Sequence, residues 1–599
     1  MTDYLPITDK TIENPSDIVA RRIEGHFDGT DIRFVVALPP KDVWQGRFFQ
    51  YTYPLTDAPP TERAMRFGYE NGGYTVQAGT DGIALGHAHA AAAAREGRRL
   101  AREFYGSDAE IFGYLYGPSG GSLQTVGGLE CTRGVWQGFV PTVLAVPISL
   151  PGTFFIRALG RLVLGEVSHI VRDAVLPGGT ADPFEGLDEI QAGVLREMQD
   201  YGIPWSGWED PDYLLGVGSP DGLLGFGSSV KAMDPSYAED FWSLPGYLGT
   251  DDGPLGRFVR SRLVERDLPI LEVRKAGDHV MGVRVEPLTR SFEPLEFDMT
   301  VDGKGLRGTY DAASGEFEFA DDADDAQRAA LAAASTVRID NRWNLALRSY
   351  YRHQVPPIDE ASHGFAHLRR ADGAPLYPQR PMLIGPTMQV ATTGGASYDG
   401  AFDAKAILCC NLMDVDALPW HADWYANRVR RSHGESFDDV FRVYFSESAD
   451  HIEGDPRAPH LVDYWGSVEE ILVRLADWVE KGLVPPASTQ YSIDRAQLTV
   501  PVDDRGGIQP SLVLERVDET RLRATASAAD DRAEIVEIAW DLGGSGTFSD
   551  VRAVRGARIV DELTIEPGAG WVQARVTSRL IGREGTRGRV QNQKRIRVS

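Results

Sequence analysis

The chain has 599 residues, of which 42% are hydrophobic and 25% charged, the composition of a globular protein with more than one domain. Its 61 Lys and Arg residues against 87 Asp and Glu residues give a formal net charge of −26, which disfavours nucleic acid and membrane surfaces as partners. Three cysteines do not make a disulfide framework, and no metal-ligand spacing appears. No signal peptide is visible at the N-terminus, so we expect a cytoplasmic protein. We also expect that it uses no metal and no cofactor.

The first 164 residues alternate strand-like and helix-like segments. Three apolar stretches precede an alanine-rich helix that stops at Gly106, and a further strand and helix follow. This alternation predicts a mostly parallel sheet covered by helices, and we assign residues 1–164 to the first part of an α/β core. The expected strands are 32–38, 47–53, 73–78 and 111–116, and the expected helices are 87–105 and 122–130.

The most informative motif is Gly117-Pro118-Ser119-Gly120-Gly121, which lies between an expected strand and an expected helix. A G-x-S-x-G turn in that context is a nucleophile elbow, in which small neighbours let the serine adopt a strained backbone conformation. The helix N-terminus that follows favours developing negative charge. We therefore expect Ser119 to be a catalytic nucleophile.

Residues 165–375 have a different character. Aromatic, proline and glycine residues are dense, and alternating stretches follow at 295–301 and 315–319. The alternation predicts antiparallel strands with one solvated face, and we assign the segment to an inserted lid domain. The acidic cluster 321–325 has the ligand density of a calcium site but lacks the glycine and terminal glutamate of a calcium loop, which favours a helix N-terminus or a solvated turn.

Sheet-like sequence returns after the insertion. We assign residues 376–491 to the second part of the core and residues 492–599, in which helical patterns stop, to an all-β sandwich. Because no catalytic candidate lies in the sandwich, we expect the site to survive its removal. The expected core strands are 405–414 and 441–445, the core helices are 420–432 and 468–482, and the sandwich strands are 498–502, 511–516 and 535–540.

Acidic residues and a histidine follow Ser119 in the chain order of an α/β-hydrolase, in which each catalytic residue follows a strand. Asp414 and Asp416 come after one expected strand, and His451 comes after the next. We predict His451 as the base and favour Asp414 over Asp416 as the acid, although the sequence leaves both open. Chain order or packing accounts better for the other candidate histidines, which are His87, His89, His353 and His421.

An oxyanion hole needs backbone N–H groups aimed at the tetrahedral oxygen. Gly120, directly after the nucleophile, is expected to supply one of them. The second is expected from the loop at the end of the early strand 47–53, around Tyr51 and Thr52.

The elbow, residues 134–141, the Asp414 segment with Pro419 and the helix end 477–482 together resemble the tannase and feruloyl esterase family. The resemblance covers about residues 25–490 and implies an α/β-hydrolase core, a lid inserted before the acid, and carboxylic ester hydrolysis. Family members often carry a cysteine before the serine and another after the histidine. This chain has Pro118 and Ile452 there, so that disulfide brace is absent.

The segment 539–546 resembles the W-D-x-G-x-G turn of polycystic-kidney-disease-type sandwich domains. Taken together, these patterns predict a serine carboxylesterase acting on a small-molecule ester or lactone with a bulky, apolar or aromatic group. Two alternatives stay open. The same triad supports acyl transfer or amide cleavage, and a hydrolase fold can also serve a non-catalytic binding protein.

Overall fold

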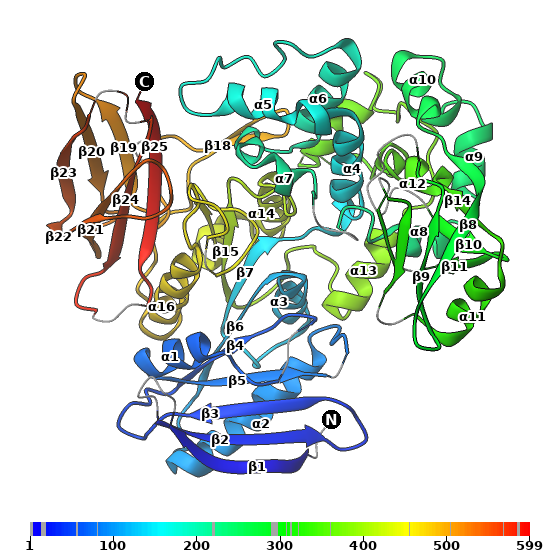
Figure 1. The fold of residues 1–599 in the computed structure, drawn as a ribbon. Helices are drawn as coiled ribbons and strands as arrows, with labels where there is room; N and C mark the ends of the chain where they lie inside the picture. Colours follow the sequence, from blue (N-terminus) through cyan, green and yellow to red (C-terminus); the bar gives the residue numbers. More distant parts are fainter. Residues whose placement is uncertain are drawn as a thin grey trace.

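Figure 1 shows the computed structural model of the chain, in which a large sheet lies between an insertion and a β-sandwich. The structure describes residues 4–598 except 14–18, 56–57, 81, 218–221, 289–297, 307, 312–313, 321–322, 360, 455, 503–504, 567, 569 and 584–586. Among the residues described, no helix is both long and apolar enough to cross a membrane.

The main sheet contains nine strands within the described residues, in the order β1-β2-β3-β5-β4-β6-β7-β15-β16. Neighbours from β5 to β16 are parallel, as the alternation of strands and helices predicts, whereas β1, β2, β3 and β5 pair antiparallel. The sequence patterns do not indicate β1 and β2, which extend the antiparallel edge. In sheet order the bounds are β1 (Tyr4–Glu13), β2 (Val19–Phe27), β3 (Arg33–Leu38), β5 (Gly73–Gly79), β4 (Arg47–Tyr51), β6 (Phe112–Ser119), β7 (Gly138–Leu144), β15 (Lys405–Asn411) and β16 (Phe441–Ser446).

Helices cover both faces of this sheet, and its central strands are therefore apolar at successive residues rather than at alternate ones. Strand β6 gives Leu115 to one hydrophobic core and Tyr114 and Tyr116 to the other. Helices α2, α3 and α14 pack on the first face, and α1 and α16 pack on the second. Their bounds are α1 (Glu62–Glu70), α2 (Ala88–Tyr105), α3 (Gly120–Cys131), α14 (Trp420–His433) and α16 (Trp465–Lys481).

The segment between β7 and β15, here called the insertion, is wider than the expected 165–375. Its α-helices other than α11 share the first core with the main sheet, where Leu159, Met198 and Tyr350 are fully buried. The insertion also contains an antiparallel sheet of seven described strands with its own core around Val283 and Ile339. The helical bounds are α4 (Gly152–Leu164), α5 (Ser168–Val175), α6 (Glu189–Tyr201), α7 (Pro211–Leu214), α8 (Gly227–Met233), α9 (Tyr237–Ser243), α10 (Pro254–Ser261), α11 (Asp325–Ala333), α12 (Arg342–Leu347) and α13 (Ile384–Thr393). The strands are β8 (Glu265–Ala276), β9 (His279–Val285), β10 (Asp298–Val301), β11 (Lys304–Leu306), β12 (Gly308–Asp311), β13 (Glu316–Phe319) and β14 (Thr336–Asp340).

The acidic cluster of the insertion begins a helix. The Asp324 carboxylate accepts from the backbone N–H of Gln327 at 2.6 Å and so caps α11, which confirms the expected helix N-terminus. Residues 321–322 of the cluster and residues 295–297 of the expected strand lie outside the described residues.

The C-terminal residues form two antiparallel sheets, β19-β20-β23 and β22-β21-β24-β25, around a core that contains Leu522 and Trp540. The strand expected at 498–502 forms a hairpin with its predecessor, and this hairpin packs on the first core, where Ala496 is buried, and not in the sandwich sheets. The bounds are β17 (Ser492–Asp494), β18 (Gln497–Thr499), β19 (Ser511–Arg516), β20 (Arg521–Ser527), β21 (Ala533–Leu542), β22 (Asp550–Gly556), β23 (Arg558–Thr564), β24 (Gly570–Leu580) and β25 (Val590–Val598).

A buried ion pair joins the sandwich to the main sheet. Arg474 on α16 is fully buried, and its guanidinium contacts Glu470 at 2.8 Å and Asp530 of the sandwich at 2.7 Å. We expect Arg474→Met to lower the free energy of unfolding by about 3–5 kcal/mol, because two largely buried carboxylates lose their partner. Thermal unfolding followed by calorimetry measures the change.

The control is Arg99→Met, because Arg99 is 52% exposed and pairs with Glu96 and Glu103 on the surface of α2. Surface pairs of this kind contribute only about 0–1 kcal/mol. Equal losses of stability in the two variants would contradict the importance of the buried pair.

Candidate active site

Ser119 occupies a strained turn at the end of β6. Its backbone has φ 52° and ψ −116°, a region that residues other than glycine rarely adopt, and α3 begins at the next residue. The strand, the turn and the helix are therefore arranged as in a nucleophile elbow. The Ser119 side chain lies at the carboxyl edge of the parallel strands.

The glycines beside Ser119 are required by close packing against the loop that follows β4. A Cβ atom on Gly117 or on Gly121 would overlap the carbonyl oxygen of Thr52. A Cβ atom on Gly120 would lie 3.0 Å from Cγ of Pro54, so this position is also tight. Small residues around the serine thus let the β4 loop approach the elbow.

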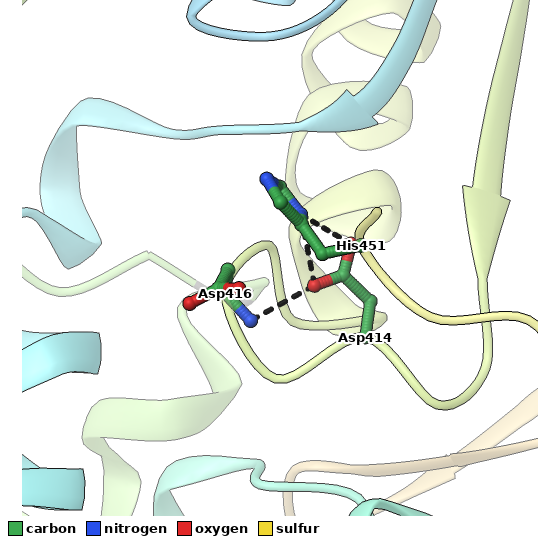
Figure 2. A group of neighbouring side chains, drawn as sticks. All are labelled: Asp414, Asp416 and His451. Atoms are coloured by element: carbon green, nitrogen blue, oxygen red, sulfur yellow. Dashed lines mark hydrogen bonds and ion pairs between the residues drawn. The ribbon is translucent and has the colours of Figure 1, made fainter. Parts of the chain in front are cut away.

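His451 and Asp414 form a hydrogen-bonded pair at the same edge of the sheet. Asp414 follows β15 and His451 follows β16, and Nδ1 of His451 lies 2.9 Å and 3.1 Å from the two Asp414 oxygens, as Figure 2 shows. Asp414 is fully buried and also accepts from the backbone N–H groups of Asp416 and Ala417, each at 2.8 Å. These bonds hold the carboxylate in one orientation toward the imidazole.

The charges around His451 favour its protonated form. Burial alone would lower the pKa of His451, but the negative charge and hydrogen bond of Asp414, together with Asp416 and Asp450, raise it to about 9. A histidine held in this way is a strong base, and the carboxylate stabilises the imidazolium that forms when it accepts a proton.

Asp416 has other partners. Its carboxylate accepts from Arg157 on α4 and from the Tyr213 hydroxyl on α7. Burial would raise the pKa of Asp416, but Arg157 and His451 hold it down at about 2. The geometry therefore pairs Asp414, and not Asp416, with the imidazole.

A metal ion is the other chemistry that these side chains could support. One donor atom each from Asp414, Asp416 and His451 lie within 4.8 Å of one another. Both carboxylates already accept hydrogen bonds, Asp414 from two backbone N–H groups and Asp416 from Arg157 and Tyr213, and the positive charge of Arg157 beside the site would repel an ion. The arrangement fits a hydrogen-bonded acid and base better than a ligand set.

The structure shows no hydrogen bond between Ser119 and His451, the predicted nucleophile and base, among the described residues. Within the described part of the chain, neither Ser119 Oγ nor His451 Nε2 has a hydrogen-bond partner, so the two residues are not bonded to each other here. Figure 2 shows the second ring nitrogen of His451 pointing away from Asp414. Hydrogen bonds of this kind are often long without substrate and shorten in the Michaelis complex.

The expected oxyanion donors need one correction. Gly120 is the first residue of α3, where a backbone N–H has no partner inside the helix. The expectation for Thr52 is wrong, because its N–H donates to the Tyr116 carbonyl at 2.9 Å and continues the pairing of β4 with β6. Tyr51 ends β4, and its hydroxyl donates to Glu453 at 3.1 Å. The backbone N–H of Tyr53, the residue after Thr52, has no partner among the described residues.

Burial or a hydrogen bond to another segment accounts for each of the other four candidate histidines. The ring of His421 contacts Ser149 Oγ at 2.8 Å and the Leu144 carbonyl at 3.2 Å, and burial lowers its pKa to about 3. His353 stacks on Tyr247 inside the insertion, and burial lowers its pKa to about 4. Burial likewise lowers the pKa of His89 to about 4, and the His87 ring contacts the Thr393 carbonyl at 2.8 Å.

A pocket of about 480 Å³ reaches the loop after His451, at Glu453 and Gly454, and was not apparent from the sequence, although neither Ser119 nor His451 lines it. Its aromatic walls come from the β4 end, β6 and α16, and Glu453, two residues after His451, lies among them. Glu453 is hydrogen-bonded to Tyr51, and burial raises its pKa. Only the aromatic run at the end of β4 could have indicated this pocket. The aromatic lining residues are Tyr51, Tyr53, Tyr116 and Trp465.

A mixed sheet in which a serine elbow, an acid and a histidine each follow a parallel strand has the architecture of an α/β-hydrolase. No protein-family model and no curated protein matches the sequence. Tannin acyl hydrolase from Aspergillus niger is similar over 86% of this chain and 88% of its own, at 13% identity and a TM-score of 0.37. Feruloyl esterase B from Aspergillus oryzae is similar over 84% and 90%, at 12% identity and a TM-score of 0.34. At these values the similarity carries no argument about activity, which must come from the site.

The tight elbow makes a steric prediction. Gly121→Ala is expected to lower esterase activity by about 10²-fold, because the new Cβ forces the Thr52 loop and the serine apart by a fraction of an ångström or more. Rates on an aryl ester measure the loss. Gly193→Ala is the matched control, since Gly193 is also helical and a Cβ there meets nothing within 4 Å. Full activity in folded Gly121→Ala would contradict the steric account.

The pH dependence follows from the charges at the site. A general base must be unprotonated to accept the serine proton, so kcat/KM is expected to rise with pH, with an apparent pKa above 6.5 and toward about 9. Asp416→Asn removes a charge that raises this pKa and should move the rising limb to lower pH. Asp414→Asn should instead cut turnover roughly 10⁴-fold, because the amide no longer holds the imidazole in the tautomer that can accept the serine proton. A larger loss for Asp416→Asn would transfer the acid role to that residue.

Proposed function

We propose that the chain is a serine-dependent carboxylic ester hydrolase, with Ser119 as nucleophile, His451 as general base and Asp414 as the acid that orients it. The observation that carries this proposal is the elbow conformation of Ser119 at the sheet edge where the buried Asp414–His451 pair also lies. A strained serine, a base of raised pKa and a fully buried carboxylate are the three parts that acyl transfer from an ester requires.

The reaction proceeds through an acyl-enzyme. Ser119 Oγ attacks the ester carbonyl while His451 Nε2 takes its proton, and the Nδ1–H group donates to Asp414. The backbone N–H groups of Gly120 and Tyr53 stabilise the oxyanion, Tyr53 replacing Thr52 in this role. His451 then protonates the leaving alcohol. Water, activated by the same histidine, releases the acid.

The proposed substrate is a small-molecule ester or lactone with a bulky apolar or aromatic group. Support comes from the pocket of about 480 Å³ whose lining combines four aromatic side chains with Arg63 and Glu453, the latter two residues after His451. The insertion is proposed as a lid, because α7 reaches the site: the Tyr213 hydroxyl donates to Asp416, and the Tyr213 ring lies 3.9 Å from the Arg457 guanidinium. The likeness of the sandwich to polycystic-kidney-disease-type domains stays a prediction.

Covalent labelling tests the proposal directly. Wild-type protein is expected to react with a fluorophosphonate probe and to hydrolyse aryl esters, and Ser119→Ala is expected to lose both, because removing one triad member leaves only a residual rate. Mass spectrometry locates the label. Ser122→Ala is the matched control, since the Ser122 hydroxyl donates to the Ser119 carbonyl at 2.5 Å and has no proposed chemical role.

Unchanged turnover in Ser119→Ala, or a label on another serine, would overturn the assignment. A wild-type protein that binds esters without labelling or turnover would instead be a non-catalytic binding protein. Adding a short-chain alcohol or amine to the assay shows whether the acyl group passes to water or to another acceptor.

A further inference from the structure

The loop that carries His451, here called the histidine loop (residues 447–464, of which 455 lies outside the described residues), joins β16 to α16 and contacts the C-terminal sandwich. We propose that the sandwich, through Gln509 and β25, positions the histidine loop and so belongs to the catalytic unit. This inference rests on the proposed esterase function. It assigns to Gln509 a positioning role that acts through the backbone three to four residues before the histidine.

Gln509 binds the backbone of Glu447 in the way a neighbouring strand would. Its Oε1 accepts from Glu447 N–H at 2.8 Å, and its Nε2 donates to the Glu447 carbonyl at 3.1 Å. The same Nε2 donates to the Gln591 carbonyl on β25 at 2.9 Å. Gln509 is only 3% exposed, so water does not compete for these bonds. One buried amide thus ties the start of the histidine loop to the last strand of the sandwich.

The Glu447 side chain also binds residues of the C-terminal segment. Its carboxylate accepts from Arg505 at 2.7 Å and from Asn592 at 3.1 Å, and Lys594 lies at 3.2 Å. Burial would raise the pKa of Glu447, but Lys594 and Arg505 lower it to about 2. The carboxylate is therefore charged and paired throughout the working pH range.

Ser448 adds backbone strain to this contact. Its φ of 54° is unfavourable for a residue other than glycine and persists only where neighbours fix it. The Ser448 hydroxyl donates to the Gln593 carbonyl on β25 at 2.8 Å. The Gln593 side chain in turn donates to the Pro459 carbonyl, further along the histidine loop, at 2.6 Å. The strained turn lies three residues before His451.

The opposite side of the histidine loop is bonded to the segment that carries the acid. Met413 N–H donates to the Ala449 carbonyl at 3.0 Å, and Asn411 donates to the Asp450 carbonyl at 2.6 Å. His451 is therefore placed between two supports, the acid segment and the sandwich. Loosening the second support lets the imidazole move relative to Asp414 and Ser119, and a displacement near 1 Å costs about 10²-fold in rate. These contacts run against the expectation that the site survives removal of the sandwich.

The test uses the full chain and Gln509→Met, which keeps the volume of the side chain and removes its hydrogen bonds. We expect kcat on p-nitrophenyl acetate to fall by about 10²-fold with little change in KM. The apparent pKa of kcat/KM should fall, because a looser histidine loop weakens the contact with Asp414 that raises it. Hydrogen exchange of peptides from residues 446–454 should become faster.

The control is Ile538→Ala, which opens the sandwich core at a fully buried residue away from the histidine loop. It should lower the melting temperature and leave kcat, the pH profile and the exchange of residues 446–454 unchanged. If Gln509→Met does not fold, Ser448→Gly replaces it, since glycine accepts the positive φ and only the bond to Gln593 is lost.

A folded variant with wild-type kcat, pH profile and exchange would overturn the positioning role. So would equal losses of kcat in Ile538→Ala. Failure of the esterase proposal gives a different result, because the wild-type protein itself would then neither label nor turn over. Hydrogen exchange does not depend on catalysis and decides in that case whether Gln509 holds the histidine loop.

Discussion

The site depends on the close approach of the β4 loop to the serine elbow. The Thr52 carbonyl occupies the space that side chains at residues 117 and 121 would need, so both positions must be glycine. With the loop in place, Ser119 keeps a φ of 52°, and Tyr53, whose N–H has no partner in the part of the chain that the structure describes, lies beside the elbow. A single backbone contact therefore fixes the proposed nucleophile and the proposed oxyanion donors together.

The charges around His451 determine which carboxylate pairs with it. His451 is surrounded by the carboxylates of Asp414, Asp416 and Asp450, which would repel one another if they were unpaired. Arg157 pairs with Asp416, and Arg457 pairs with Asp450 at 2.6 Å. Because Asp416 and Asp450 each pair with an arginine, Asp414 is the carboxylate that pairs with the imidazole. The insertion takes part in this balance, since Arg157 and Tyr213 both come from it.

The insertion and the sandwich both contact the unit formed by the main sheet and its helices. The insertion shares its helical core with the main sheet, and the sandwich is bound to α16 by Arg474 and to the histidine loop by Gln509. The sandwich is joined through buried, paired polar groups, which demand precise geometry and so transmit position more strictly than apolar contacts do. This difference is the physical basis for the proposed positioning of the histidine loop by the sandwich.

The sequence by itself determined the elements whose signals are local. The G-x-S-x-G turn between a strand and a helix, the glycine stop of α2 and the helix start in the acidic cluster at Asp324 all depend on neighbouring residues, and each of these elements forms. Only the tertiary structure decided the rest. The pairing of β1 with β2, the use of Thr52 N–H by β6, the place of the hairpin β17–β18 and the contact of Gln509 with Glu447 join residues whose sequence patterns do not identify their partners. Hydrogen bonds and packing between distant segments leave no periodicity in the chain, and their partners are fixed only when the sheet edge brings them together.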